Sequence, residues 1–109
     1  MEKDFKNFYF YWKSYNELTS KEIYEILHLR QKVFVEEQNC AYVDSDFRDQ
    51  KSLHLLVYDQ NKLIGYLRLI KMDKYQDCPS IGRIVLARAY RSNGIGKQLN
   101  EEGIKKSQK

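Results

Sequence analysis

The stretch YRSNGIGKQL combines residue types that bind anions. Arg91 and Lys97 bring positive charge, and Gly94 and Gly96 are two of only five glycines in the chain. The stretch follows an apolar run, IGRIVLA, and leads into helical spacing, which predicts a strand, a glycine turn and a helix N-terminus. Backbone N–H groups and the helix macrodipole favour a phosphate there, and glycine allows its close approach. We therefore expect the turn to bind a pyrophosphate group.

Two common phosphate-binding motifs do not fit this spacing. If Gly96-Lys97 were the Gly-Lys pair of a Walker loop, the position of its first glycine would hold Arg91 and that of its Ser or Thr would hold Gln98. A dinucleotide fingerprint that started at Gly94 would need a glycine where Leu99 stands. The pattern that fits is Arg/Gln-x-x-Gly-x-Gly/Ala, which begins at Arg91.

Hydrophobic spacing predicts the elements around the turn. TSKE places Thr19 three residues before Glu22, a capping box that starts a helix predicted over Ser20–Glu36. The next stretch, Gln38–Ser52, loses this period and predicts a long loop. Strands are predicted at 7–15, 53–59, 63–72 and 81–87, the last of them buried, and a C-terminal helix from 94 is weakened toward its end by Gly103. This order predicts an α/β or α+β fold with a mixed sheet.

Three segments carry a resemblance to a known family. LRQKVFVEEQNCAYVDSDFRD, HLLVYDQNKLIGYLRL and IGRIVLARAYRSNGIGKQL resemble, in this order, the ElaA-like branch of the GCN5-related N-acetyltransferase (GNAT) superfamily. The resemblance implies an acyl-CoA N-acyltransferase fold, with a mixed, largely antiparallel sheet flanked by helices. It also implies direct transfer of an acetyl group from acetyl-CoA, as co-substrate, to a small-molecule or peptide amine. It also implies that the pantetheine arm pairs with the backbone of Ile84, Val85 and Leu86 as an added strand does, and that the phosphates lie on Arg91, Ser92, Asn93, Gly94, Ile95, Gly96 and Lys97.

The strand before the glycine turn offers no carboxylate as a general base. Arg83 is its only charged residue, unlike family members with a glutamate in that strand. We single out His54 and Glu37 as candidate catalytic residues, with Glu36, Asp44 and Asp46 as further candidate bases. His54 suits this role by its intrinsic pKa. The alternative, a hydrogen-bonded structural histidine, stays open.

The loop that follows the first predicted helix is the candidate substrate loop. Its EEQN and DSD segments are similar to those of the ElaA-like branch, which favours substrate binding over the alternative of a solvated acidic loop. The residues expected to contact substrate are Gln38, Asn39, Tyr42, Asp44 and Asp46.

The composition is that of one globular domain over residues 1–109, with 42% hydrophobic and 31% charged residues. The first residues are neither a signal peptide nor a membrane span, so a cytoplasmic location without a membrane partner is expected. Cys40 and Cys78 lack metal-ligand or CxxC spacing, which predicts free thiols and no metal site. Most of the charge, +4 net, is expected on the solvated surface.

Three functions stay open at this stage. The fold of the family continues after this helix with further strands, whereas the sequence ends at Lys109, so an exposed edge is expected on the strand at 81–87. The chain is then an active acetyltransferase, or a truncated and catalytically impaired fragment that binds CoA or forms a homodimer through that edge. A basic nucleic-acid-binding module is the third alternative. Only the terminal KKSQK clusters lysines, so no nucleic-acid partner is expected.

Overall fold

A computed structural model describes residues 8–38, 44–72 and 78–108 of the chain. Four strands form one sheet in the order β1-β2-β3-β4. All three pairings are antiparallel, so the sheet of the described residues contains no parallel pair. The strands span Phe8–Ser14 (β1), Ser52–Asp59 (β2), Lys62–Ile70 (β3) and Ser80–Leu86 (β4). The predicted strands and the predicted hairpin are thereby confirmed.

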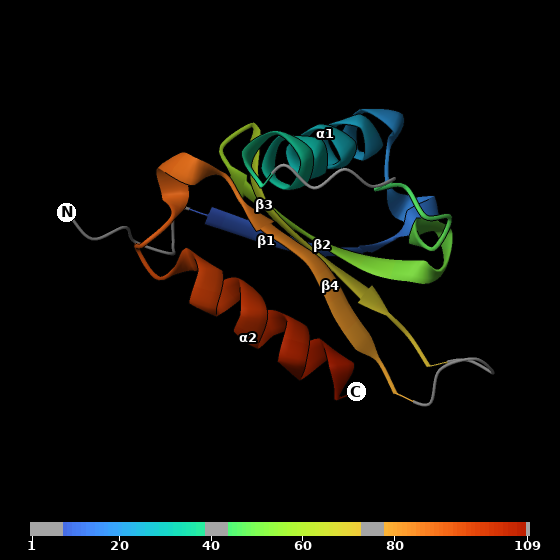
Figure 1. The fold of residues 1–109 in the computed structure, drawn as a ribbon. Coiled ribbons are helices and arrows are strands. Elements are labelled where there is room, and N and C mark those ends of the chain that lie inside the picture. Colours follow the sequence, from blue (N-terminus) through green and yellow to red (C-terminus); the bar gives the residue numbers. More distant parts are fainter. Residues whose placement is uncertain (1–7, 39–43, 73–77, 109) are drawn as a thin grey trace.

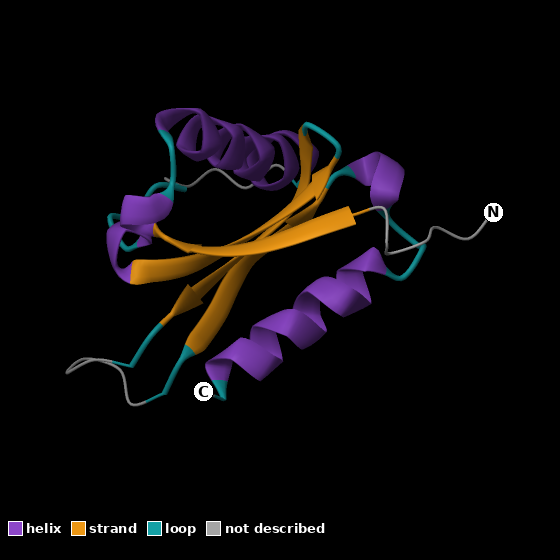
Figure 2. Cartoon of the chain, turned by 180° about the vertical axis from the view of Figure 1, so that it is seen from behind, coloured by secondary structure: helices purple, strands orange, loops and turns teal. Residues whose placement is uncertain are grey.

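Two helices cover opposite faces of this sheet. In Figure 1, α1 (Ser20–Arg30) lies above the sheet and α2 (Ile95–Ser107) lies below it, and Figure 2 shows the same layers from behind. Short 3₁₀ turns stand at Tyr15–Glu17 (η2), Asp49–Lys51 (η4) and Arg88–Tyr90 (η5). The α+β architecture predicted from the order of elements is confirmed. Among the described helices, none has the length and apolar character that crossing a membrane requires.

The first helix begins with the predicted capping box. The Thr19 side chain accepts a hydrogen bond from the Glu22 backbone N–H at 3.1 Å, and the Glu22 carboxylate accepts one from the Thr19 N–H at 2.8 Å. The predicted helix over Ser20–Glu36 is helical throughout, but its last part is a π-helical segment, η3 (Gln31–Glu37). The Gln38 N–H donates to the Val33 carbonyl five residues back, at 3.1 Å. Such wide turns are rare and occur frequently at functional sites.

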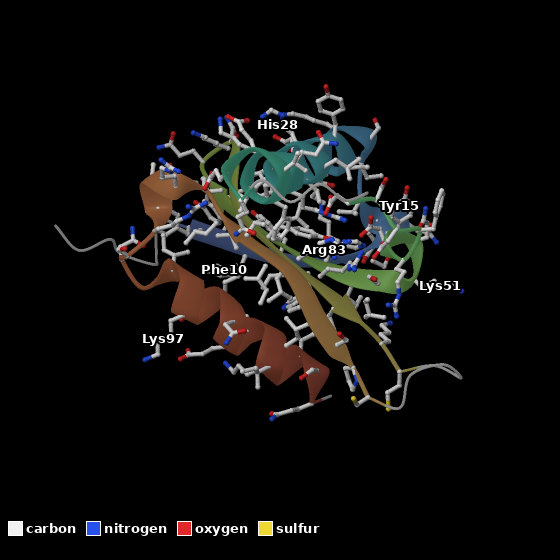
Figure 3. All side chains as sticks on the ribbon, viewed as in Figure 1. Phe10, Tyr15, His28, Lys51, Arg83 and Lys97 are labelled. Carbon is white, nitrogen blue, oxygen red and sulfur yellow. The ribbon has the colours of Figure 1, made fainter. Side chains whose placement is uncertain are left out.

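Side chains of β2 and β3 alternate between two hydrophobic clusters. Leu55 and Leu67 point toward α2, where they join Ile95 and Leu99. The neighbouring Leu56 and Tyr66 point toward α1, in a cluster that includes Ile26, Leu29, Val33 and Val85. Figure 3 shows Phe10 on the α2 side, consistent with its packing against the first cluster. Since both faces are covered, the two central strands are apolar on both faces.

The last strand, β4, is an edge strand, and the prediction that it is buried is wrong. Only Val85 is buried, and Ile84 is 42% exposed. Within the described residues β4 pairs with β3 alone, so its outer edge carries no strand. Arg83 interrupts the extended backbone of β4, because its φ of 51° is left-handed. Arg68 pairs with Gly82 and Tyr66 with Val85, so two residues of β4 oppose one of β3 in a bulge at this point.

The glycine near the end of α2 is a packing residue. The helix continues through Gly103 to Ser107, and Gly103 is buried. A Cβ atom placed on Gly103 would lie 2.8 Å from the Leu67 Cδ1 atom. The glycine that weakens the helix by its propensity is therefore required for the close approach of α2 to β3.

Candidate functional site

The glycine turn lies between the end of β4 and the start of α2. Ser92, with a φ of 67°, and Gly94, with a φ of 90°, both adopt the left-handed conformation. Gly94 is the N-cap of α2 and has no side chain that could cap the helix. The first hydrogen bond of the helix, 3.1 Å long, runs from the Gln98 N–H to the Gly94 carbonyl. The N–H groups of residues 95–97 therefore have no partner within the helix. This is the geometry that the sequence predicted for an anion site.

The surroundings of the turn fit an anionic group. A Cβ atom on Gly96 would meet only the Leu86 Cδ2 atom, at 3.8 Å, which is ordinary contact. The protein's own packing therefore does not require a glycine at position 96, and its role toward a phosphate stays a prediction. The Asn93 Oδ1 atom is buried without a hydrogen-bond partner in the described structure, and as an acceptor it would take a donor rather than an anion. Lys97 projects from α2 on the side away from the sheet (Figure 3).

Arg91, the first residue of the motif, is held by two contacts. Its Nε donates to the Leu86 carbonyl at 2.8 Å, and its Nη1 lies 2.8 Å from the Glu37 carboxylate. The Arg88 Nη2 atom lies 3.8 Å from the same carboxylate oxygen. The hydrogen bond from Arg91 outweighs the effect of burial and lowers the pKa of Glu37. Glu37, a candidate base from the sequence, is thus placed beside the predicted phosphate site.

The three residues of β4 that are predicted to bind pantetheine differ in burial. Ile84 is exposed, Val85 is buried against α1, and Leu86 is half-buried with its carbonyl on Arg91. The adjoining bulge directs the Arg83 side chain to the α1 side of the sheet, as Figure 3 shows. The backbone role of these residues toward pantetheine stays a prediction.

The carboxylates of the predicted substrate loop lie in an ion cluster of three arginines and three aspartates. Arg30 contacts Asp44 at 2.8 Å and Asp49 at 2.9 Å. Arg68 contacts Asp46 at 2.8 Å and Asp49 at 3.0 Å. From the bulge of β4, Arg83 reaches Asp44 at 2.9 Å and Asp46 at 3.4 Å. The cluster joins α1, β3 and β4 to the loop before β2.

This cluster is an exception to the expectation that most charge is solvated, which the other described charged residues follow. Arg30, Asp44 and Arg68 are all buried. Burial alone would raise the pKa of Asp46, but hydrogen bonds from the Arg68 side chain and the Arg48 backbone lower it to about 2. Buried charges require such partners, because the desolvation of an unpaired ion is costly. Asp44 and Asp46 are therefore committed to arginines, and their contact with a substrate stays a prediction.

The remaining residues of the substrate loop are only partly described. Gln38 is exposed at the end of η3, while Asn39, Tyr42 and Cys40 lie outside the described residues. A groove of about 490 Å³ runs along α1 and η3 and is lined in part by Glu36, Asp44 and Ser45. Cys78 is an exposed free thiol, as predicted.

His54, the other candidate base, is buried with both ring nitrogens in contact. Nε2 lies 2.8 Å from the Asp49 carbonyl, which only accepts, so this nitrogen carries the proton. Nδ1 then accepts from the Tyr66 hydroxyl. Burial lowers the pKa of His54, which is consistent with a neutral ring. As a base, His54 would have to give up the hydrogen bond from Tyr66, and its catalytic role stays a prediction.

Sequence reasoning missed the partners in this network. Arg68 and Tyr66 lie in an apolar strand, and Arg30 shares the helical spacing of core residues. A charged residue at a position that the hydrophobic pattern assigns to the core is a usable signal for a buried ion pair. The pattern does not reveal which carboxylate pairs with it.

Comparison with known proteins identifies the family and the fold. The sequence profile described as "Acetyltransferase (GNAT) family" matches residues 11–109. Protein ElaA of Escherichia coli is 37% identical over 87 residues, which cover 78% of this chain and 57% of that protein. A UPF0039 protein from Synechocystis is 38% identical over 98 residues, which cover 88% of this chain and 63% of that protein. The crystal structure of Escherichia coli ElaA has a TM-score of 0.87 and 31% identity, with 92% of this chain and 69% of that chain covered.

The chain belongs to the acetyltransferase (GNAT) family. Within that family it falls in the ElaA-like branch, with the acyl-CoA N-acyltransferase fold. By sequence it matches 57% of the length of ElaA and 63% of that of the Synechocystis protein, so it spans only part of these relatives.

Proposed function

We propose that this protein is an N-acetyltransferase that transfers an acetyl group directly from acetyl-CoA to an amine. The observation that carries the proposal is the uncapped N-terminus of α2, where the left-handed Gly94 follows β4 and Arg91 stands beside it. Membership of the GNAT family supports it, since that family generally uses acetyl-CoA and amine acceptors.

Each part of the site has a defined task in this proposal. The N–H groups of residues 95–97 and the Arg91 guanidinium hold the pyrophosphate, because these donors converge at a helix N-terminus. The free edge of β4 at Ile84–Leu86 binds the pantetheine arm by backbone hydrogen bonds. Bound acetyl-CoA supplies an activated thioester. The protein contributes orientation of the amine and removal of its proton.

Isothermal titration calorimetry with acetyl-CoA tests the cofactor site. We expect saturable binding by the natural chain and its loss in Gly94→Glu, because the new side chain is strained at a φ of 90° and places a carboxylate at the phosphate position. Asn100→Glu is the matched control, since it adds the same charge to an exposed position of α2. Absence of binding by the natural chain would refute the proposal.

Release of the CoA thiol in the presence of a panel of amines tests the reaction itself. The acceptor is not specified by the fold, because one fold hosts many acceptor sites. The panel therefore includes polyamines, aminoglycosides, amino acids and peptide N-termini. Transfer to any of these, dependent on acetyl-CoA and absent in Gly94→Glu, supports the proposed reaction.

A second candidate function is CoA binding through the glycine turn alone, without turnover, with a second copy of the chain instead of the pantetheine arm on the outer edge of β4. The observation that favours it is the lack of a strand against this edge in the described sheet, together with the exposed Ile84. Unpaired edges pair readily with a second chain. Analytical ultracentrifugation separates the two candidates: a dimer that binds CoA but acetylates no amine supports this one, and a monomer that acetylates an amine excludes it.

A further inference from the structure

The Glu37 carboxylate lies close to two arginines. It lies 2.8 Å from the Arg91 Nη1 atom and 3.8 Å from the Arg88 Nη2 atom. The Arg88 side chain is 79% exposed, whereas that of Glu37 is only 16% exposed. The carboxylate therefore has a close partner in Arg91 and a second cation already within reach of a small movement.

The contacts of Arg91 leave part of its guanidinium open. Nε donates to the Leu86 carbonyl and Nη1 contacts Glu37, while Nη2 makes no hydrogen bond or ion pair within the described residues. Nη1 and Nη2 form the pair of donors that a phosphate takes up in bidentate fashion. A phosphate that used this pair would have to share Nη1 with Glu37 or displace the carboxylate from it.

Electrostatic repulsion favours displacement of the Glu37 carboxylate by a phosphate over the sharing of Arg91 by the two anions. A carboxylate and a phosphate bound to one guanidinium are like charges a few ångströms apart, and their repulsion is only partly screened at a half-buried site. The exposed Arg88 can accept Glu37, so the carboxylate need not be left without a cation. We propose that Glu37 is a displaceable internal anion, which occupies Arg91 until an anionic group of the ligand takes its place and Glu37 passes to Arg88.

This exchange reaches the other half of the proposed site. Glu37 is the last residue of η3, and Gln38 begins the segment predicted to contact the acceptor. Movement of the carboxylate from Arg91 toward Arg88 changes the ion pairs of the residue that directly precedes that segment. The inference rests on the proposed cofactor site and makes Glu37 a residue that acts through Arg91 rather than a base.

Calorimetric titration with CoA and, separately, with inorganic pyrophosphate tests the exchange. Glu37→Gln keeps a hydrogen-bond acceptor for Arg91 but removes the competing charge, so both ligands should bind about threefold more tightly. Arg88→Gln removes the second partner of Glu37, so both should bind about threefold more weakly. Glu101→Gln is the matched control, because it removes one carboxylate from an exposed position of α2. Thermal unfolding of each variant verifies that it is folded.

Two double variants show whether these effects pass through the ion pair. In the Arg91→Gln background, Glu37→Gln should no longer change the affinity, and in the Glu37→Gln background, Arg88→Gln should no longer weaken it. A merely structural role of Glu37 would instead weaken binding in Glu37→Gln. Either that result or an undiminished effect in the double variants overturns the exchange.

The two ligands separate failure of the inference from failure of the proposed function. If CoA binds and Glu37→Gln leaves its affinity unchanged, the exchange is wrong and the cofactor site stands. If pyrophosphate alone binds and shows the predicted changes, the exchange stands and the assignment to CoA is wrong. If the natural chain binds neither ligand, both are overturned.

Discussion

Replacing Gly96 and Gly103 of α2 by alanine, in separate variants, should have opposite effects on the stability of the protein. Alanine is favoured over glycine by about 1 kcal/mol inside a helix. At Gly103 the new Cβ atom would lie 2.8 Å from Leu67 Cδ1 and 3.3 Å from Ile81 Cδ1. Leu67 is fully buried, so relief of this overlap requires repacking that costs about 1–3 kcal/mol. The free energy of unfolding of Gly103→Ala should therefore fall by roughly 1 kcal/mol.

At Gly96 the same methyl group meets only Leu86 Cδ2, at 3.8 Å, so the protein is not overpacked. Gly96→Ala should be as stable as the natural chain or more stable by up to about 1 kcal/mol. Its methyl group nevertheless lies where the phosphate must approach the backbone, so the affinity for CoA should fall about tenfold, the effect of losing one charge-assisted hydrogen bond.

Urea denaturation measures the first effect and calorimetric titration with CoA measures the second. The expected pattern is a stable Gly96→Ala that binds CoA weakly and a less stable Gly103→Ala that binds CoA normally while folded. A Gly96→Ala variant with unchanged affinity would refute the assignment of this glycine to the ligand. A Gly103→Ala variant of unchanged or increased stability would refute the packing argument.

Three further predictions concern the parts that position the site. Thr19→Ala should lower the free energy of unfolding by about 1 kcal/mol in urea denaturation, because the capping box is lost. Arg30→Met should lower it by about 3 kcal/mol, since buried Asp44 loses one of its two arginine partners and Asp49 loses another, whereas Met in place of the exposed Lys51 should have little effect. The pKa of Asp46 is about 2 in the fold against 3.8 ordinarily, so its stabilising contribution is present above pH 3.8 and disappears as the pH falls toward 2. The difference in stability between the natural chain and Asp46→Asn should shrink across that range, and a constant difference would contradict it.

Local patterns in the sequence predicted the glycine turn and the elements on either side of it. The capping box at Thr19 and the uncapped N-terminus at Gly94 both depend on residues within a few positions of each other, so spacing alone reveals them. The hairpin of β2 and β3 was predicted for the same reason, from two apolar runs joined by a short polar turn.

Contacts between residues far apart in the sequence form the rest of the candidate site, and local patterns did not predict them. Asp44 and Asp46 were predicted to face a substrate, but Arg83, 39 and 37 positions further along the chain, takes up both. His54 was predicted from its intrinsic pKa, whereas its environment was set by Tyr66 on the neighbouring strand. A sequence shows that a carboxylate or an imidazole is present but not which group desolvates or pairs with it.

The sequence by itself determined the family, the order of the elements and the position of the glycine turn, because these depend on hydrophobic period, glycine placement and motif spacing. Only the tertiary structure decided that Gly103 is a packing residue, that three arginines neutralise the loop carboxylates, and that Glu37 is paired with Arg91. The physical reason is that burial and charge pairing depend on distances between distant segments. Those distances are set when α1, η3 and the loop pack on the sheet.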